Sequence, residues 1–295
     1  MDSTSTAKKL HDISNLSEKE LKESADSSAN STATKESSAK SSDTGRSDED
    51  VNKARSKKTG LSGVAENLIR KFSMVLFPLF IVPLIVLYVV ALAGASAPAF
   101  FAYDWVQTLW STDMKWFEYF RQGLGFGVAF VTFGLSLMIS VPILNFPFIF
   151  LVRKYKGPWF SLESIPWYYH NALLYLVRYT ILDFVTPSPL NTWFFKAMGM
   201  KIGKGSIINT SNVSDACLIE IGDYVTVGGS AYMMAHYGVK GYLVIDQLKI
   251  ENKAMIGLKA KLLGGVHIGE KAVIAPNAVV LPKTAVAPYS KYGYE

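Results

Sequence analysis

Small aliphatic residues recur at every sixth position over the last part of the chain. From Ile250 to Lys291 the sequence reads, in sixes, IENKAM, IGLKAK, LLGGVH, IGEKAV, IAPNAV, VLPKTA and VAPYSK. A six-residue period indicates one short strand and one turn per unit, and three such units form one coil of a triangular parallel β-helix. Neither the 3.6-residue period of an α-helix nor the alternation of an ordinary strand fits this pattern.

The repeat begins earlier in the chain and is interrupted once. Matching units, IGKGSI, IGDYVT and VGGSAY, lie between residues 202 and 232. Ile250 stands 23 positions after Val227, one short of a multiple of six. The pattern therefore predicts an excursion from the coil, Met233 to Leu248, with His236 near its start.

Two uncharged apolar runs precede the repeat. The first lies between Lys71 and Asp104, and the second runs from Gln122 to Val152. About 20 apolar residues cross a bilayer, so these runs predict two transmembrane helices within a membrane region, 61–157. Residues 158–199 are rich in aromatic residues but carry scattered charges, which predicts amphipathic helices lying at the membrane interface.

The distribution of Lys and Arg predicts the orientation of these spans. Basic residues flank the outer ends of both runs, whereas the 104–121 loop contains only Lys115 and Arg121. Cytoplasmic loops carry an excess of Lys and Arg. We therefore expect a multi-pass membrane protein with both termini and the β-helix, residues 200–295, on the cytoplasmic side.

The first 60 residues differ in composition from the rest. They contain eleven basic and eleven acidic residues and no aromatic residue, so the net charge of +6 belongs to residues 61–295. A segment this polar buries too little apolar surface to offset its chain entropy. We expect a disordered polar tail, either a solvated spacer or a phosphorylated or partner-binding arm. The remaining basic residues stand singly or flank apolar runs, so no nucleic-acid partner is expected.

The repeat resembles that of the hexapeptide-repeat acyltransferases, whose β-helix is left-handed, an exception to the usual crossover rule. TPSPLNTWFFKAMGMKIGKG, which starts at Thr186, and LIEIGDYVTVGGSAYMMAH, which ends at His236, are similar to the membrane-embedded C-terminal region of ε-poly-L-lysine synthetase-type enzymes. The similarity covers roughly Phe72 to Glu295. It implies a homotrimer that transfers an acyl or aminoacyl group from a thioester. The present sequence contains no adenylation or carrier domain, so a separate thioester donor is expected: CoA, or a carrier or adenylating protein as partner.

Acyl transfer needs a base that takes the proton from the attacking amine or hydroxyl. A histidine with its ordinary pKa near 6.5 can do this at neutral pH. Of the four histidines, only His236 lies in the interruption of the repeat, where the resemblance places the base. His267 falls at a corner of the coil, and His170 stands among aromatic residues of the interfacial segment. We predict His236 as the catalytic residue; the alternative is that its ring simply packs against neighbouring Met and Tyr side chains.

Glycines of the repeat are candidates for contact with the donor. Gly257, Gly264 and Gly265 would let a pantetheine arm approach the backbone, and Lys259 is one of several lysines available to its phosphates. Alternatively, a corner glycine is simply what the coil requires. No tightly bound cofactor is expected. A three-histidine zinc site is weakly supported, because the β-helix offers only His236 and His267.

These features lead to two functional hypotheses. The first is a membrane-bound acyltransferase that passes an acyl or aminoacyl group from a CoA or carrier-protein thioester to an amine or hydroxyl. The second is a non-catalytic β-helix scaffold that tethers a peptide-synthetase-type partner to the membrane. The first requires His236 and the second does not. The donor and acceptor are not identified by the sequence.

Overall fold

The computed structural model describes residues 56, 58–111 and 113–294, with the side chains of 73–77 left out. These residues belong to one compact unit, Asp50–Glu295. The predicted disordered tail lies outside the described residues, apart from its last few positions.

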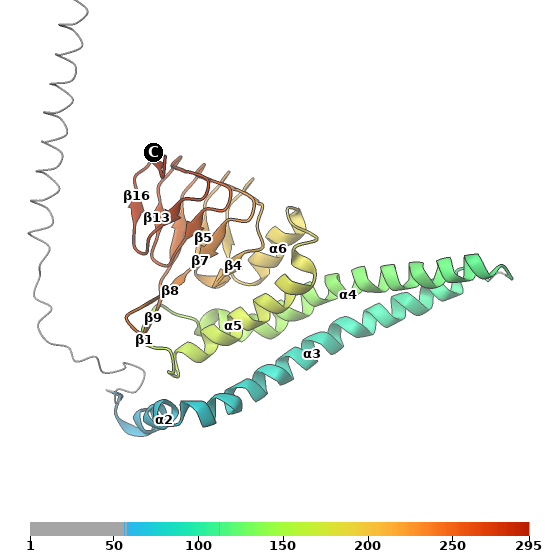
Figure 1. The fold of residues 1–295 in the computed structure, drawn as a ribbon, viewed down its shortest axis with the longest axis horizontal. Helices are drawn as coiled ribbons and strands as arrows, with labels where there is room; N and C mark the ends of the chain where they lie inside the picture. Colours follow the sequence, from blue (N-terminus) through green and yellow to red (C-terminus); the bar gives the residue numbers. More distant parts are fainter. Residues whose placement is uncertain (1–55, 57, 112, 295) are drawn as a thin grey trace, which may run out of the picture. The chain divides into compact units, whose positions relative to one another are not determined.

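Two long helices form a hairpin at one side of this unit (Figure 1). A short helix, α2 (Gly60–Lys71), leads into α3 (Ser73–Thr108), and α4 (Lys115–Leu151) returns beside it. Small residues at the contact, such as Ala91 and Ala95, are fully buried and allow the two helices to approach closely.

Both helices are long and apolar enough to cross a membrane. Within their most apolar stretches only 17% and 28% of the residues are buried. Large side chains such as Val89 and Phe130 are more than half exposed. A core helix of a soluble domain would be covered on most sides, so this apolar surface distinguishes α3 and α4 from core helices.

A second layer of helices lies between the hairpin and the β-helix (Figure 1). It contains α5 (Ser164–Val177), a π-helical turn η1 (Arg178–Leu182) and α6 (Pro189–Ala197). On the α3 side, Tyr88 donates a hydrogen bond to the Ala172 carbonyl at 3.0 Å. On the other side, Tyr175 and Ser214 hydroxyls are 2.5 Å apart. The α5 helix therefore connects the apolar hairpin to the β-helix.

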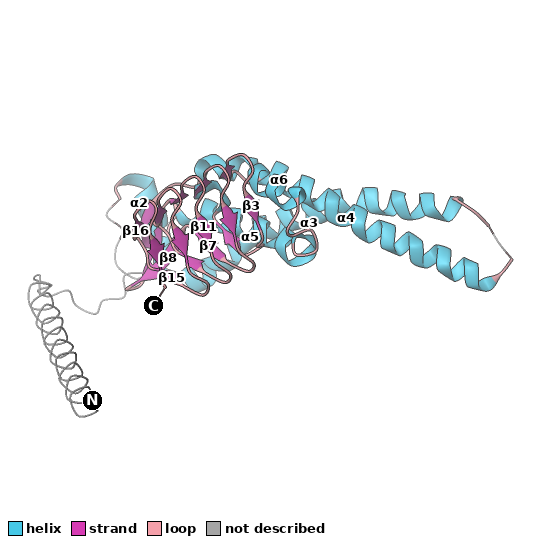
Figure 2. Cartoon of the chain, turned by 90° about the horizontal axis from the view of Figure 1, so that it is seen from above, coloured by secondary structure: helices cyan, strands magenta, loops and turns pink. Residues whose placement is uncertain are grey.

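The C-terminal region is a three-sided β-helix of parallel sheets (Figure 2). The first side contains β2 (Lys201–Ile202), β5 (Ile219–Ile221), β10 (Leu248–Ile250), β13 (His267–Ile268) and β16 (Ala285–Val286). The second contains β3 (Ile207–Ile208), β6 (Thr226–Val227), β11 (Met255–Ile256), β14 (Val273–Ile274) and β17 (Lys291–Tyr292). The third contains β4 (Val213–Ser214), β7 (Tyr232–Met234), β12 (Lys261–Leu262) and β15 (Val279–Val280).

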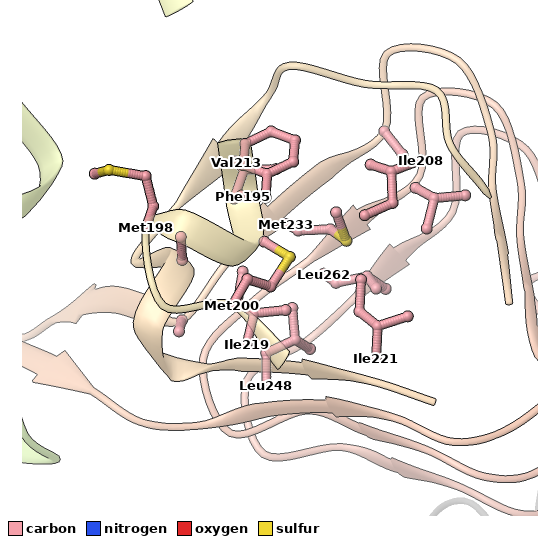
Figure 3. Close-up of a cluster of buried hydrophobic side chains, with 14 of the residues drawn as sticks. Phe195, Met198, Met200, Ile208, Val213, Ile219, Ile221, Met233, Leu248 and Leu262 are labelled. Atoms are coloured by element: carbon pink, nitrogen blue, oxygen red, sulfur yellow. The ribbon is translucent and has the colours of Figure 1, made fainter. Parts of the chain in front are cut away.

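The six-residue pattern corresponds to this architecture. The first aliphatic residue of each unit is buried in the prism, as seen for Ile256, Leu262 and Ile268. The fourth residue of the unit adopts a left-handed backbone conformation, with φ of 59° at Lys253 and 56° at Lys259. One end of the core is closed by α6 and the turn after it, where Phe195 and Met200 pack with Ile219 (Figure 3). The predicted hexapeptide-repeat β-helix is confirmed.

The predicted excursion is a β-hairpin made of β8 (His236–Val239) and β9 (Tyr242–Ile245). It is shorter than expected, because Met233 and Leu248 still belong to coil strands. A third strand, β1 (Tyr155–Pro158), pairs antiparallel with β9. Because β1 follows α4 directly and β9 lies between β1 and β8, the sheet links the apolar hairpin, through β9, to the strand that begins with His236.

Candidate active site

One corner of the β-helix brings together residues from successive coils. Strands β4, β7 and β12 are in register on one side of the prism, so the residues that follow them stack. Asp215 follows β4, His236 follows β7 and Gly264 follows β12. A Cβ atom at Gly264 would lie 3.0 Å from the backbone nitrogen of His236.

The His236 ring and the Asp215 carboxylate form a hydrogen-bonded pair. His236 Nδ1 lies 2.6 Å from Asp215 Oδ2, and the Ala235 N–H donates to the same oxygen at 2.9 Å. The other oxygen, Oδ1, accepts from Trp167 Nε1 at 2.5 Å and from Asn171 Nδ2 at 2.7 Å. Asp215 is completely buried, and these four donors satisfy both of its oxygens.

The carboxylate is held in its ionised form. Burial acts to raise the pKa of the Asp215 carboxyl, but the hydrogen bond and charge of His236 and the hydrogen bond from Asn171 outweigh it, so the pKa lies below its usual range. An ionised carboxylate only accepts hydrogen bonds, so His236 Nδ1 must carry the proton. That tautomer leaves the lone pair on Nε2, and the His236 side chain is 20% exposed. The geometry is therefore suited to a base that acts at Nε2.

The α5 helix fixes this pair from outside the β-helix. Asp215 has a φ of 60°, an uncommon conformation for a non-glycine residue. The Asn171 side chain clamps it by also accepting the Asp215 N–H at 2.8 Å. Trp167 packs edge-on against the His236 ring with the centroids 5.0 Å apart. Trp167 and Asn171 are four residues apart on α5, so they lie on the same face of the helix.

The predicted donor-contact glycines divide between two corners. Gly264 and Gly265 lie at the corner of His236, and Gly265 has a φ of 81°. Gly257 and Lys259 lie at the corner on the other side of β12. A Cβ at Gly257 would be 2.4 Å from the backbone nitrogen of Pro276, so the stacking of the coils by itself requires glycine there.

The other candidate side chains lie elsewhere. His170 is fully buried with Nδ1 2.9 Å from Asn145 Oδ1, and burial lowers its pKa to about 4. His267 begins β13 and faces Glu251 Oε1 at 2.8 Å. Burial, together with the charge of Asp215, raises the pKa of the Cys217 thiol to about 12. Within the described residues, no group of three or more His, Cys, Asp or Glu side chains is arranged to hold a metal ion.

The pairing of Asp215 with His236, and the parts played by Trp167 and Asn171, were not predicted. In the sequence Asp215 is one of several acidic residues around the repeat, 21 positions from His236. The spacing of Trp167 and Asn171 is a weak signal that two polar side chains of the aromatic segment point the same way. Nothing in the sequence indicates that they point toward the β-helix.

Three parallel sheets built on a six-residue repeat define a hexapeptide-repeat β-helix, and the chain resembles transferases of that kind. No family model matches the sequence. A hexapeptide-repeat acetyltransferase from Vibrio cholerae is 20% identical, with a TM-score of 0.34 and coverage of 40% of this chain and 82% of that one. Serine acetyltransferase isoform 3 from Entamoeba histolytica, solved with cysteine, is 15% identical, with a TM-score of 0.28 and coverage of 67% and 69%.

A curated relative is the delta-poly-L-ornithine synthetase of Acinetobacter baumannii. It is 19% identical over 160 residues, which are 52% of this chain. The chain spans only 12% of the length of that synthetase.

Proposed function

We propose that this protein is a membrane-bound acyltransferase that uses His236 as a general base. It would transfer an acyl or aminoacyl group from a thioester to an amine or a hydroxyl. The observation that carries this proposal is the His236–Asp215 pair, held by four hydrogen-bond donors at the corner where the repeat opens into a hairpin.

The pair supplies the proton chemistry of such a transfer. Nε2 of His236 accepts the proton as the acceptor nitrogen or oxygen attacks the thioester carbonyl, and the buried Asp215 carboxylate stabilises the imidazolium that forms. The new C–N or C–O bond forms, the C–S bond breaks, and the leaving thiolate takes the proton from Nε2. A positioned base of this kind contributes on the order of 10² to 10⁴-fold.

The same corner suits a pantetheine-bearing donor, either CoA or a carrier protein. Gly264 and Gly265 lie beside the base, and Lys283 of the next coil, whose Cγ lies 2.9 Å from where a Cβ of Gly265 would be, is available to the phosphates of the donor. Gly257 and Lys259 belong to another corner, so they would meet His236 only across a subunit boundary. The homotrimer implied by the resemblance would provide such a boundary.

The apolar surfaces of α3 and α4 support a membrane location. We propose that these helices span the membrane with the β-helix on the cytoplasmic side. Glycosylation acceptors inserted in the loop between them should then be modified, while the native Asn209-Thr210-Ser211 sequence should remain unmodified.

The mechanism is tested with the detergent-purified protein, its His236→Ala variant and His267→Ala as a matched control. Each is given acetyl-CoA, longer acyl-CoAs and aminoacyl carrier thioesters, and free thiol is followed with and without simple amines. Because His267 is 46% exposed and faces Glu251 on a different side of the coil, its loss should leave transfer unchanged. Loss of His236 should reduce transfer by the 10² to 10⁴-fold that a base contributes.

Transfer that survives His236→Ala with every donor would show that the mechanism is wrong. A folded parent that releases no thiol from any donor would favour the scaffold instead. In that case a pull-down should recover an adenylating or carrier protein, and recovery should not depend on His236.

A further inference from the structure

An apolar cavity of about 400 Å³ lies on the membrane side of the His236 corner. Its walls come from three helices and the segment before α5. The lining includes Ile69 of α2, Phe80 and Ile81 of α3, Trp159, and Ile165 and Trp167 of α5. A cavity of this volume with mainly apolar walls is typical of a small-molecule site.

The polar groups in the lining are already used within the protein. Ser164 Oγ donates to the Trp159 carbonyl at 2.7 Å, and the Ser161 hydroxyl donates to Glu163. The Tyr169 hydroxyl donates to the Phe80 carbonyl at 2.5 Å. An occupant therefore gains little from hydrogen bonds with these groups, whereas a hydrocarbon chain gains from leaving water.

The cavity adjoins the apolar outer surface of α3. Phe80 and Ile81 line it, while their neighbours Leu79 and Val82 are 64% and 55% exposed on the outside. If α3 spans the bilayer as proposed above, lipid chains contact this surface directly. A membrane lipid is thus the hydrophobic molecule at highest local concentration next to the cavity.

One wall of the cavity is shared with the proposed active site. Trp167 lines the cavity, contacts the His236 ring and donates to Asp215. Trp159 packs against Trp167 with ring centroids 6.1 Å apart. A Cβ at Gly238, on the strand that begins with His236, would lie 3.3 Å from the Trp159 ring. A molecule held by these tryptophans is therefore separated from the base by the ring of Trp167.

We propose that the cavity binds the hydrocarbon chain of a membrane amphiphile whose polar end, an amine or a hydroxyl, is the acceptor of the acyl group. This inference rests on the proposed function and narrows its acceptor to a lipid. A separate apolar hollow of about 420 Å³, lined by Ile143 of α4 and Trp193 of α6 among others, does not include any residue that contacts His236. It therefore serves as the control.

The binding test uses the full chain in phosphatidylcholine vesicles that contain phosphatidylethanolamine with a diazirine on its acyl chain. After illumination, labelled peptides are mapped by mass spectrometry. The parent should be labelled in 159–169 and around Ile81. Two variants fill the cavity from opposite walls, Ile165→Trp and Ile81→Trp, and each should lower that label about tenfold. Ile143→Trp, which fills the control hollow, should not.

The two variants change different helices, Ile165 on α5 and Ile81 on α3. Misfolding of one helix would therefore not explain a loss of label in both variants. Label that is absent from these segments in the parent, or unchanged in both variants, would refute the lipid site. The His236→Ala variant should be labelled like the parent, because the base does not line the cavity.

A transfer assay separates the acceptor inference from the proposed function. The Ile165→Trp variant should still transfer to a soluble amine. Its rate of transfer to the phosphatidylethanolamine amine should be about tenfold lower than that of the parent. A parent that uses soluble amines and never the lipid amine would refute the lipid acceptor while leaving the proposed function intact. A parent that is labelled normally but transfers to neither amine would refute both.

Discussion

Replacing Asp215 with Asn tests both the stability and the chemistry of the proposed site. In the native protein each carboxylate oxygen accepts two hydrogen bonds, one pair from Trp167 and Asn171 and the other from Ala235 and His236. The Asn side chain keeps one oxygen and replaces the other with an NH₂ group, which only donates. If the NH₂ group faces Trp167 and Asn171, two of the four donors face a donor in a fully buried position. If it faces Ala235 and His236, only the Ala235 N–H does, because the imidazole can move its proton to Nε2 and accept at Nδ1.

The loss of folding free energy can be estimated from the number of donors left without an acceptor. A buried donor left without an acceptor costs about 1–3 kcal/mol, so one or two together cost about 1–6 kcal/mol. Removing the charge also removes the cost of burying it, which is several kcal/mol for an unpaired ion. We therefore expect a loss at the lower end, about 2–3 kcal/mol, or roughly 4–12 °C in the apparent melting temperature for a unit of this size.

The difference in stability between the parent and Asp215→Asn should depend on pH in a defined direction. Because the pKa of Asp215 is lowered in the folded protein, its contribution is fully present above the unfolded value of about 3.9. The contribution is lost as pH falls through the folded pKa. The part of the stability difference between the parent and Asp215→Asn that comes from ionisation of Asp215 should therefore narrow only as pH falls below about 4.

The assay is thermal unfolding in detergent at a fixed scan rate, with thiol release measured on the same samples. Asp223→Asn is the matched control, because its carboxylate accepts the Lys204 N–H in a half-buried turn and an amide oxygen can replace it. Transfer should fall on the order of 10² to 10⁴-fold in Asp215→Asn, since the His236 tautomer is no longer fixed. A variant that is as stable and active as the parent would refute the four-donor geometry.

Three further substitutions test neighbouring features. Trp167→Phe keeps an aromatic ring but removes one donor to the carboxylate of Asp215; kcat should fall about tenfold with little change in KM, because a hydrogen bond to a charged group contributes about 1.5–3 kcal/mol. The pKa of the Cys217 thiol is about 12, so little thiolate is present at pH 8. Iodoacetamide should therefore modify the native protein on the order of 10³-fold more slowly than the unfolded chain, as followed by mass spectrometry. Cys217→Ser should keep transfer activity. Gly264→Ala should lower transfer about tenfold because its Cβ would press on the backbone of the base, whereas Gly229→Ala meets only the end of a flexible leucine side chain at 3.1 Å and should be tolerated.

The repeat could be predicted because each unit carries its own local signal. From Ile250 to Lys291 each unit buries its first aliphatic residue, such as Ile256 or Ile268, and its fourth residue has a positive φ. The interruption was also visible, because 23 residues do not fit the period. The sequence did not show that β1, which comes just after α4, completes the sheet of the excursion, because pairing between distant strands has no local pattern.

For a related reason the sequence predicted His236 but not the residues that hold it. His236 stands out as the histidine at the interruption, but its partner Asp215 depends on the register of β4 and β7. That register pairs Val213 with Met233, an offset of 20 positions where three unbroken units would give 18, so the period of the repeat does not predict it. The donors from α5 depend on how that helix docks, which is decided by packing and not by periodicity.

The contacts of α5 give a physical reason for joining the α3–α4 hairpin and a β-helix in one compact unit. The β-helix alone supplies the Ala235 N–H and the His236 ring to Asp215, which leaves one carboxylate oxygen to be satisfied from outside. Trp167 and Asn171 satisfy it, and they can do so only because hydrogen bonds such as that of Tyr88 fix α5 against α3. A shift of α5 along α3 would therefore withdraw donors from a buried charge and loosen the base. Through this connection the position of the α3–α4 hairpin would set the geometry of the proposed reaction.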